Sequence, residues 1–184
     1  MSETAAQAMD VDEFLVWGRE RQGRFELHDG VVVAMAPKRF QHVEAKLAAV
    51  NALQAAIVKA GVPCRALIEG MAVRVSKVSA FIPDAMVFCG SRPDPSALEI
   101  PDPAVVVEVL SPSTASVDFG LKLEGYFRIP SVAHYLVIDA ERRKVVHYLR
   151  SADDRIEVRI LGEGELILDP PGIVVPIRSL MDRE

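Results

Sequence analysis

The run of residues 104–110, Ala-Val-Val-Val-Glu-Val-Leu, constrains the fold of this chain more than any other segment. Its β-branched residues follow one another without alternation, which is typical of a strand covered on both faces. Glu108 interrupts the run, and burying its carboxylate without a partner would be costly or would force it to bind a proton. The segment alone leaves two interpretations equally open. Glu108 either has a structural role, at a solvated edge or in an ion pair, or belongs to a functional site.

The composition of the 184-residue chain is that of one folded domain with a substantial core. Half of the residues (50%) are hydrophobic, which excludes general disorder. No apolar run is long enough to span a bilayer, and the N-terminus lacks the basic-then-apolar order of a signal peptide. We therefore expect a cytoplasmic protein with no membrane partner, consisting of a flexible tail at residues 1–9 and a single domain at residues 10–184.

The acidic balance of the chain bears on its partners. A net charge of −5 argues against strong non-specific binding of nucleic acid, which needs several Lys or Arg side chains near the phosphates. It leaves room for a local basic groove.

The two cysteines, Cys64 and Cys89, lack CxxC spacing, so neither a zinc site nor a disulfide framework is indicated. We expect both cysteines to be small buried residues.

Hydrophobic periodicity predicts the element order α-β-β-α-β-β-β-β-α-β-β-β-β, and hence an α/β domain with a central mixed sheet flanked by helices. A first helix is expected at about residues 11–20, after a capping box. A long helix is expected after Pro37, ending at Gly61, because four apolar residues recur at helical spacing: Val43, Leu47, Val50 and Ile57. A third helix is expected to begin in the SPST segment at residues 111–114 and to end near Ile129.

Turn signals predict two β-hairpins. Residues 24–37 form the first, an N-terminal hairpin that turns at Asp29-Gly30. The segments 64–69 and 71–75 resemble a second, joined at Glu69-Gly70.

Two other residues bear on Glu108. Asp84 follows Pro83 at the mouth of a predicted strand, although Pro-Asp is also a common turn dipeptide. Lys122 shares one face of the third helix with Phe119, Leu123 and Tyr126. A lysine in such a stripe either extends to the helix edge or faces a polar pocket. The short connection at Ser111–Ser113 favours the pocket, because it returns the helix to the end of the Glu108 strand.

An Asp, a Glu and a Lys at one sheet are suited to hydrolysis of a phosphodiester. Carboxylates bind a hard cation such as Mg²⁺ through oxygen and leave water in its remaining positions. The metal lowers the pKa of a bound water and neutralises phosphodiester charge. The lysine can orient or activate that water, or stabilise the developing negative charge.

Several of these segments together resemble the Uma-two family of restriction endonucleases, within the PD-(D/E)XK nuclease superfamily. The resemblance covers roughly residues 10–150. It rests on Asp84, on VVEVLSPST at residues 106–114 and on Asp118–Lys122 with Tyr126, and also on residues 24–37, His42 and HYLVID at residues 134–139. It implies a restriction-endonuclease-like fold, with Asp84, Glu108 and the backbone carbonyl of Val109 as metal ligands and Lys122 as the catalytic lysine.

Two positions depart from the family pattern. Leu110 occupies the usual position of the lysine, and the resemblance places that lysine on the next helix instead, in agreement with the stripe that contains Lys122. Ala36 stands where the family usually has serine, which puts only local hydrogen bonding in doubt.

The implied activity is a Mg²⁺-dependent endonuclease, with Mn²⁺ as a second suitable metal, that hydrolyses DNA by a metal-activated water. Because restriction-type nucleases often cut both strands as dimers, a homodimer is also implied. Two alternatives stay open: a non-catalytic nucleic-acid-binding or interaction module that retains the fold, and a metal-dependent phosphoesterase for small substrates. A narrow pocket with an acidic rim would favour small substrates, whereas an open groove with basic walls would favour DNA.

Three further residues are secondary site candidates, each with a structural alternative. Glu26 is otherwise an exposed residue of the first hairpin, and His42 a surface histidine near a helix start. Tyr126 is otherwise a core residue. His134 and His147 have no spacing that suggests metal binding.

Overall fold

The structure is a computed structural model that describes residues 8–110 and 119–181. Its helices are α1 (Val11–Arg19), α2 (Phe40–Ala60), α3 (Phe119–Phe127) and the 3-10 helix η1 (Ile177–Leu180). Its strands are β1 (Phe25–His28), β2 (Val31–Ala34), β3 (Cys64–Ile68), β4 (Val73–Arg74), β5 (Ala80–Phe81), β6 (Ala85–Cys89), β7 (Pro103–Val109), β8 (His134–Asp139), β9 (Lys144–Arg150), β10 (Ile156–Leu161), β11 (Glu165–Leu168) and β12 (Ile173–Pro176).

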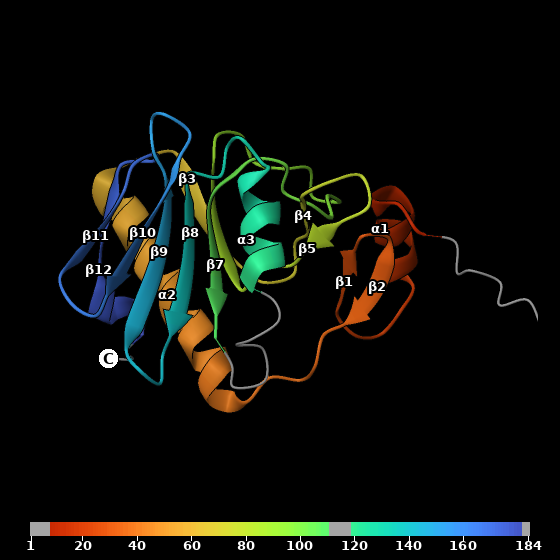
Figure 1. Ribbon diagram of the computed structural model, residues 1–184, viewed down its shortest axis with the longest axis horizontal. Helices are drawn as coiled ribbons and strands as arrows, with labels where there is room; N and C mark the ends of the chain where they lie inside the picture. The colour runs from red at the N-terminus through yellow and green to blue at the C-terminus, as the bar shows by residue number, and fades with distance from the viewer. Residues whose placement is uncertain (1–7, 111–118, 182–184) are drawn as a thin grey trace, which may run out of the picture.

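A mixed sheet of six strands forms the centre of the molecule, in the order β10-β9-β8-β7-β6-β3 (Figure 1). The β7 and β8 strands are parallel and joined through α3, whereas the other neighbours are antiparallel. One face of the sheet packs on α2, the β11–β12 hairpin and η1. The other face packs on α3, β4 and β5. The predicted α/β architecture with a central mixed sheet is therefore confirmed.

A second sheet, in the order β2-β1-β5-β4, lies beside the central one. Its β1–β2 hairpin turns at Asp29 and Gly30, both at positive φ, as the predicted tight turn requires. Helix α1 packs on it through Val11 and Phe14, and begins at the predicted capping box of Asp10 and Glu13. Residues 1–7 of the predicted tail lie outside the described residues, and Met9 donates its N–H to the carbonyl of Gly30.

Helix α2 forms where predicted and ends at Gly61, whose φ of 65° provides the left-handed cap. The four apolar residues that predict the helix do not all face the sheet, because Val43 and Leu47 are 46% and 53% exposed whereas Ile57 is buried. The helix instead faces the sheet with small side chains and a few larger ones, namely His42, Ala45, Lys46, Ala49, Ala52, Leu53, Ala56 and Ile57. The alanines bring the helix backbone close to the sheet.

The second predicted hairpin is also wrong. The β3 strand pairs with β6 of the central sheet, whereas β4 pairs with β5 in the second sheet. The β3–β6 register places Cys64 directly opposite Cys89, and the two form a disulfide with a Cα–Cα distance of 3.9 Å. The expectation of two separate buried cysteines therefore fails, and Cys89 is exposed.

Two strands were not expected, β5 and β12. The β5 strand has only two residues, and β12 follows the sequence Pro170-Pro171-Gly172. Helix α3 ends before Ile129, as predicted, but its expected start in residues 111–114 lies outside the described residues. No described helix is long and apolar enough to cross a membrane.

A buried pair of histidines predicts how the fold responds to acid. His134 Nδ1 of β8 lies 2.9 Å from His147 Nε2 of β9. Burial lowers the pKa of each ring from 6.5 to about 4. As the pH falls from 6.5 towards 4, the unfolded chain binds protons that the folded chain does not. The free energy of unfolding should therefore fall by up to about 3 kcal/mol for each histidine.

Urea denaturation at a series of pH values measures this loss. His147→Gln should flatten the dependence between pH 6.5 and 4, whatever its stability at pH 7.5. An unchanged slope in the variant would show that the pair does not cause it.

Candidate active site

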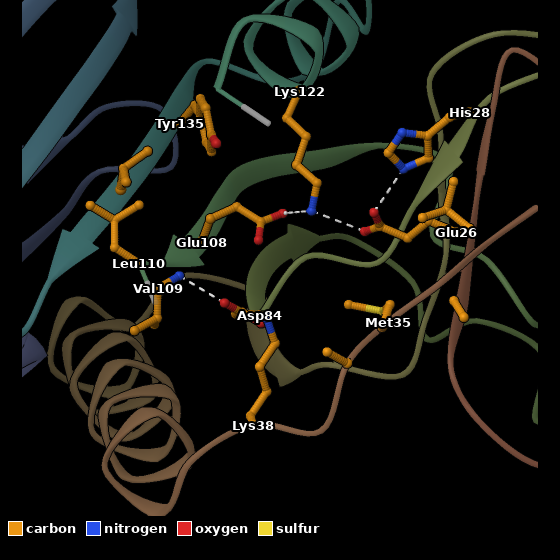
Figure 2. A pocket seen from close by; sticks show the side chains of 14 residues that line it. Glu26, His28, Met35, Lys38, Asp84, Glu108, Val109, Leu110, Lys122 and Tyr135 are labelled. Atoms are coloured by element: carbon orange, nitrogen blue, oxygen red, sulfur yellow. Dashed lines mark hydrogen bonds and ion pairs between the residues drawn. The ribbon is translucent and has the colours of Figure 1, made fainter. Parts of the chain in front are cut away.

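The two predicted carboxylates lie on neighbouring strands of the central sheet. Asp84 directly precedes β6, and Glu108 belongs to β7. Because Ala85 pairs with Val107 in this antiparallel ladder, Asp84 lies opposite Glu108. The backbone N–H of Val109 donates a hydrogen bond of 2.7 Å to Asp84 Oδ2, which fixes the Asp84 carboxylate beside β7 (Figure 2). The structure thus brings together the two acidic residues that the sequence singled out.

Lys122 reaches this position from α3 and is buried. Its ammonium lies 2.9 Å from Glu108 Oε1 and 3.0 Å from Glu26 Oε1, so it bridges two carboxylates (Figure 2). The polar-pocket interpretation of the lysine is therefore correct, and it does not extend to the helix edge. The Tyr126 hydroxyl, one turn further along α3, donates to the same Glu108 oxygen at 2.8 Å. Tyr126 is both a core residue and a direct partner of Glu108.

The surroundings raise the pKa values of both Glu108 and Lys122, for different reasons. Burial raises the pKa of Glu108 to about 7, although the nearby Lys122 ammonium favours the charged form. Burial alone would lower the pKa of Lys122, but the charges of Glu108 and Glu26 outweigh it and raise that pKa above its ordinary value. Lys122 is therefore a protonated donor and a fixed positive charge at neutral pH, and is poorly suited to accept a proton from water.

Glu26 is buried, contrary to the expectation of an exposed hairpin residue. One of its oxygens accepts the N–H of Ile82 and the Lys122 ammonium, and the other lies 2.9 Å from His28 Nε2. These partners outweigh the effect of burial and lower the pKa of Glu26. The second sheet thus supplies a carboxylate, held by His28, that positions the lysine.

Asp84 is held from its other side by α2. Lys46 Nζ lies 2.5 Å from Asp84 Oδ1 and 2.6 Å from Glu69 Oε2, and Arg24 also pairs with Glu69. His42 is buried rather than at the surface, with Nε2 3.4 Å from Asp84 Oδ2. That contact is too poorly aligned to be a hydrogen bond, and neither ring nitrogen has another hydrogen-bond partner within the described residues.

The groups packed around Asp84 control its charge. Burial would raise the pKa of Asp84, but the adjacent His42 ring, the Lys46 ammonium and the Val109 N–H outweigh burial and lower it to about 2. Asp84 is therefore ionised throughout the physiological range, whereas Glu108 titrates near neutrality. The two carboxylates face each other with different affinities for protons.

Sequence reasoning missed Lys46, Glu69 and His28. The spacing of His42, Lys46, Ala49 and Leu53 by three or four residues is a signal that could have found the lysine. It was hidden because Val43 and Leu47 mark a more apolar stripe. Glu69 carries no comparable signal, since its partners Arg24 and Lys46 are distant in sequence. His28 lies two residues from its partner Glu26, so strand alternation places both on one face of β1, but that face is expected to be exposed.

These side chains surround a cavity of about 270 Å³ (Figure 2). Glu26, Asp84, Glu108 and Lys122 form its polar wall, and residues 33–36 with Lys38 form the side towards the first hairpin. A space of this size lies just below the range of small-ligand pockets, which begins at about 300 Å³. It has room for one phosphate group with water, and far too little for a nucleic-acid duplex to enter.

The donor set fits a hydrated divalent cation. Carboxylate oxygens are the ligands that Mg²⁺ and Mn²⁺ prefer. The site contains three carboxylates, Glu26, Asp84 and Glu108. Its cations are Lys38 and Lys122 in the cavity wall and the buried Lys46 behind Asp84. No group of three or more His, Cys, Asp or Glu side chains among the described residues is arranged to hold a metal. An ion at this site would therefore take most of its ligands from water.

Known proteins resemble this chain over most of its length. The Uma2 family model, described as "Putative restriction endonuclease", matches residues 11–178. Two uncharacterized proteins of Synechocystis sp. are similar in sequence. The protein slr1290 is 26% identical over 167 residues, covering 82% of this chain and 85% of that protein. The protein sll1609 is 34% identical over 88 residues, covering 46% and 50% respectively.

A solved structure has the same fold. The crystal structure of "a putative nuclease belonging to DUF820" from Anabaena variabilis superposes with a TM-score of 0.72. The match covers 94% of this chain and 97% of that one, at 16% sequence identity. It confirms the restriction-endonuclease-like α/β fold expected from the sequence.

Proposed function

This chain belongs to the Uma2 family, and from that membership and the site geometry we propose that it is a metal-dependent endonuclease that hydrolyses DNA phosphodiester bonds. The observation that carries the proposal is the convergence of Asp84, Glu108 and the protonated Lys122 on one cavity. A structural ion pair would need only one carboxylate for each lysine. Here Glu108 has a raised pKa beside an ionised Asp84, an arrangement that favours an added cation.

Each residue of the site has its own role in the proposed reaction. Asp84, Glu108 and the backbone carbonyl of Val109 would hold Mg²⁺ or Mn²⁺. A bound ion supplies a water of lowered pKa and neutralises charge on the phosphodiester. Lys122 donates hydrogen bonds to the negative charge that develops on the phosphoryl oxygens. Glu26 and Tyr126 keep the Lys122 ammonium and the Glu108 carboxylate in place.

A second candidate function is hydrolysis of small phosphodiesters. The small size of the cavity, with three carboxylates in its wall, is the observation that favours it. Lys38 lines the same cavity and provides a basic group that either substrate could use. In the DNA reaction, only the scissile phosphate would enter the cavity while the remainder of the nucleic acid lay outside.

Cleavage assays with supercoiled plasmid DNA and with bis(p-nitrophenyl) phosphate test both functions. We expect nicking with Mg²⁺ or Mn²⁺ that EDTA abolishes. We also expect Glu108→Gln to lower the nicking rate by roughly 100-fold or more, because it removes a charged metal ligand. Glu124→Gln, which changes an exposed carboxylate of α3, is the matched control and should leave the rate unchanged.

The outcomes separate the alternatives. Hydrolysis of the small diester without nicking favours the phosphoesterase. No hydrolysis of either substrate with Mg²⁺ or Mn²⁺ favours the non-catalytic module. Nicking at the wild-type rate by a folded Glu108→Gln variant would contradict the assignment of the site.

A further inference from the structure

The β10 strand (Ile156–Leu161) forms one edge of the central sheet. Within residues 8–110 and 119–181 it pairs only with β9. Ile156, Val158 and Ile160 point to one face of the sheet and are 39%, 55% and 70% exposed. Edge strands are usually protected by proline, lysine, a bulge or a short length. The β10 strand has six residues, no proline and no lysine, and its two charged residues, Glu157 and Arg159, have opposite signs, so a strand of complementary charge can pair with its edge.

The residues of β10 on either side of Val158 match in hydrophobicity and are opposite in charge. The strand reads Ile-Glu-Val-Arg-Ile over residues 156–160, with apolar residues at both ends and at the centre, an acid before the centre and a base after it. In an antiparallel pair of two such strands centred on Val158, Glu157 of each copy faces Arg159 of the other. Ile156 of each copy then faces Ile160 of the other. Apolar side chains meet on one face, and opposite charges meet on the other face.

We propose that two copies of this chain associate through antiparallel pairing of their β10 strands about a two-fold axis at Val158. The interface is isologous, because each contact occurs twice. It joins the two central sheets into one continuous sheet through backbone hydrogen bonds. This proposal does not depend on the proposed function, since none of its residues lines the cavity of the candidate active site.

The neighbouring strand extends the apolar part of the surface. Val146 and Tyr148 of β9 are the cross-strand partners of Ile160 and Val158, and both are only partly buried. Pairing with a second copy would cover these side chains together with β10. On the opposite face, Glu157 and Arg159 are about half exposed and lie 3.0 Å apart within one chain. An exposed pair of this kind contributes little to stability, so both residues are free to exchange partners.

Charge reversal tests the register of the proposed dimer. Sedimentation velocity should show the wild-type chain in a concentration-dependent monomer–dimer equilibrium. Glu157→Arg and Arg159→Glu should each weaken dimerisation at least tenfold, because each places two pairs of like charges in register. The Glu157→Arg/Arg159→Glu double variant should dimerise like wild type. Arg128→Glu, at an exposed position directly after α3, is the control and should not alter the equilibrium.

Mixing the two single variants separates contacts between chains from contacts within one chain. In a mixed pair every position 157 faces an opposite charge at position 159 of the other copy, so the mixture should form heterodimers although each variant alone is monomeric. A wild-type chain that stays monomeric at the highest attainable concentration overturns the proposal. So does a dimer that neither single variant weakens, because another surface must then form it. Thermal melting of each variant confirms that it is folded.

Discussion

Lys122→Met is expected to lower the rate of metal-dependent DNA cleavage by roughly 100- to 1,000-fold. The ammonium is a protonated donor between Glu108 and Glu26, and it is placed to stabilise negative charge that develops in the cavity. Methionine has a similar length and removes both the charge and the hydrogen bonds. Single-turnover nicking of plasmid DNA at saturating Mg²⁺ measures the loss.

The variant also leaves two buried carboxylates without their shared cation, so a loss of stability could imitate a loss of chemistry. Glu26→Gln/Lys122→Met removes one of these negative charges and should recover part of the stability while its activity stays low. Urea denaturation and cleavage rates measured on the same preparations separate the two effects. Wild-type cleavage by the folded double variant would exclude a catalytic role for Lys122.

The largest effect on stability is expected for Lys46→Met. Lys46 is fully buried, and its ammonium is bonded to Asp84 and Glu69. Removing it leaves the Asp84 carboxylate inside the protein with a much weaker set of partners. Breaking a buried ion pair from one side typically costs about 3–5 kcal/mol, and we expect a decrease of that size in the free energy of unfolding. Urea denaturation at neutral pH measures it.

Two variants control for other causes. Lys59→Met makes the same substitution at an exposed position of α2 and should change the free energy of unfolding by less than about 0.5 kcal/mol. Asp84→Asn/Lys46→Met should be more stable than Lys46→Met alone, because the unpaired carboxylate is then neutral. Equal effects of Lys46→Met and Lys59→Met would show that the buried pair does not hold this part of the fold together.

Local patterns were sufficient for much of the fold. The valine-rich run around Glu108 is a central strand, Asp29-Gly30 is a hairpin turn, and Gly61 ends the long helix. Pairing between distant segments could not be found in this way. The local pattern pairs segment 64–68 with the nearest following strand, although its partner β6 lies beyond two other strands. The disulfide was missed for the same reason, because only the β3–β6 register brings Cys64 next to Cys89.

The residues of the candidate site also fall into those that a local sequence pattern predicts and those that depend on contacts between distant segments. Local patterns predict Asp84, Glu108 and Lys122. Glu108 interrupts a valine-rich strand, Lys122 interrupts the apolar face of a helix, and Asp84 directly precedes an apolar strand. Among the residues that hold them in place, local patterns offer Glu26, His42 and Tyr126 only as secondary candidates and do not indicate Lys46. The sequence of β1 alone predicts an exposed Glu26, because its partners lie at β5 and on α3. Lys46 lies on the alanine-rich face of α2 that packs on the sheet, and not on the more apolar stripe of Val43 and Leu47.

The central claim is that Asp84 and Glu108 together hold a divalent cation beside Lys122. A crystal of the protein soaked in Mn²⁺, with data collected to locate the anomalous signal of manganese, tests this claim most directly. We predict a single strong anomalous peak within coordination distance of both carboxylates and adjacent to the Lys122 ammonium, absent from Glu108→Gln crystals treated in the same way. No peak at this cavity in the wild-type crystal, or a peak that persists in the variant, would contradict the claim.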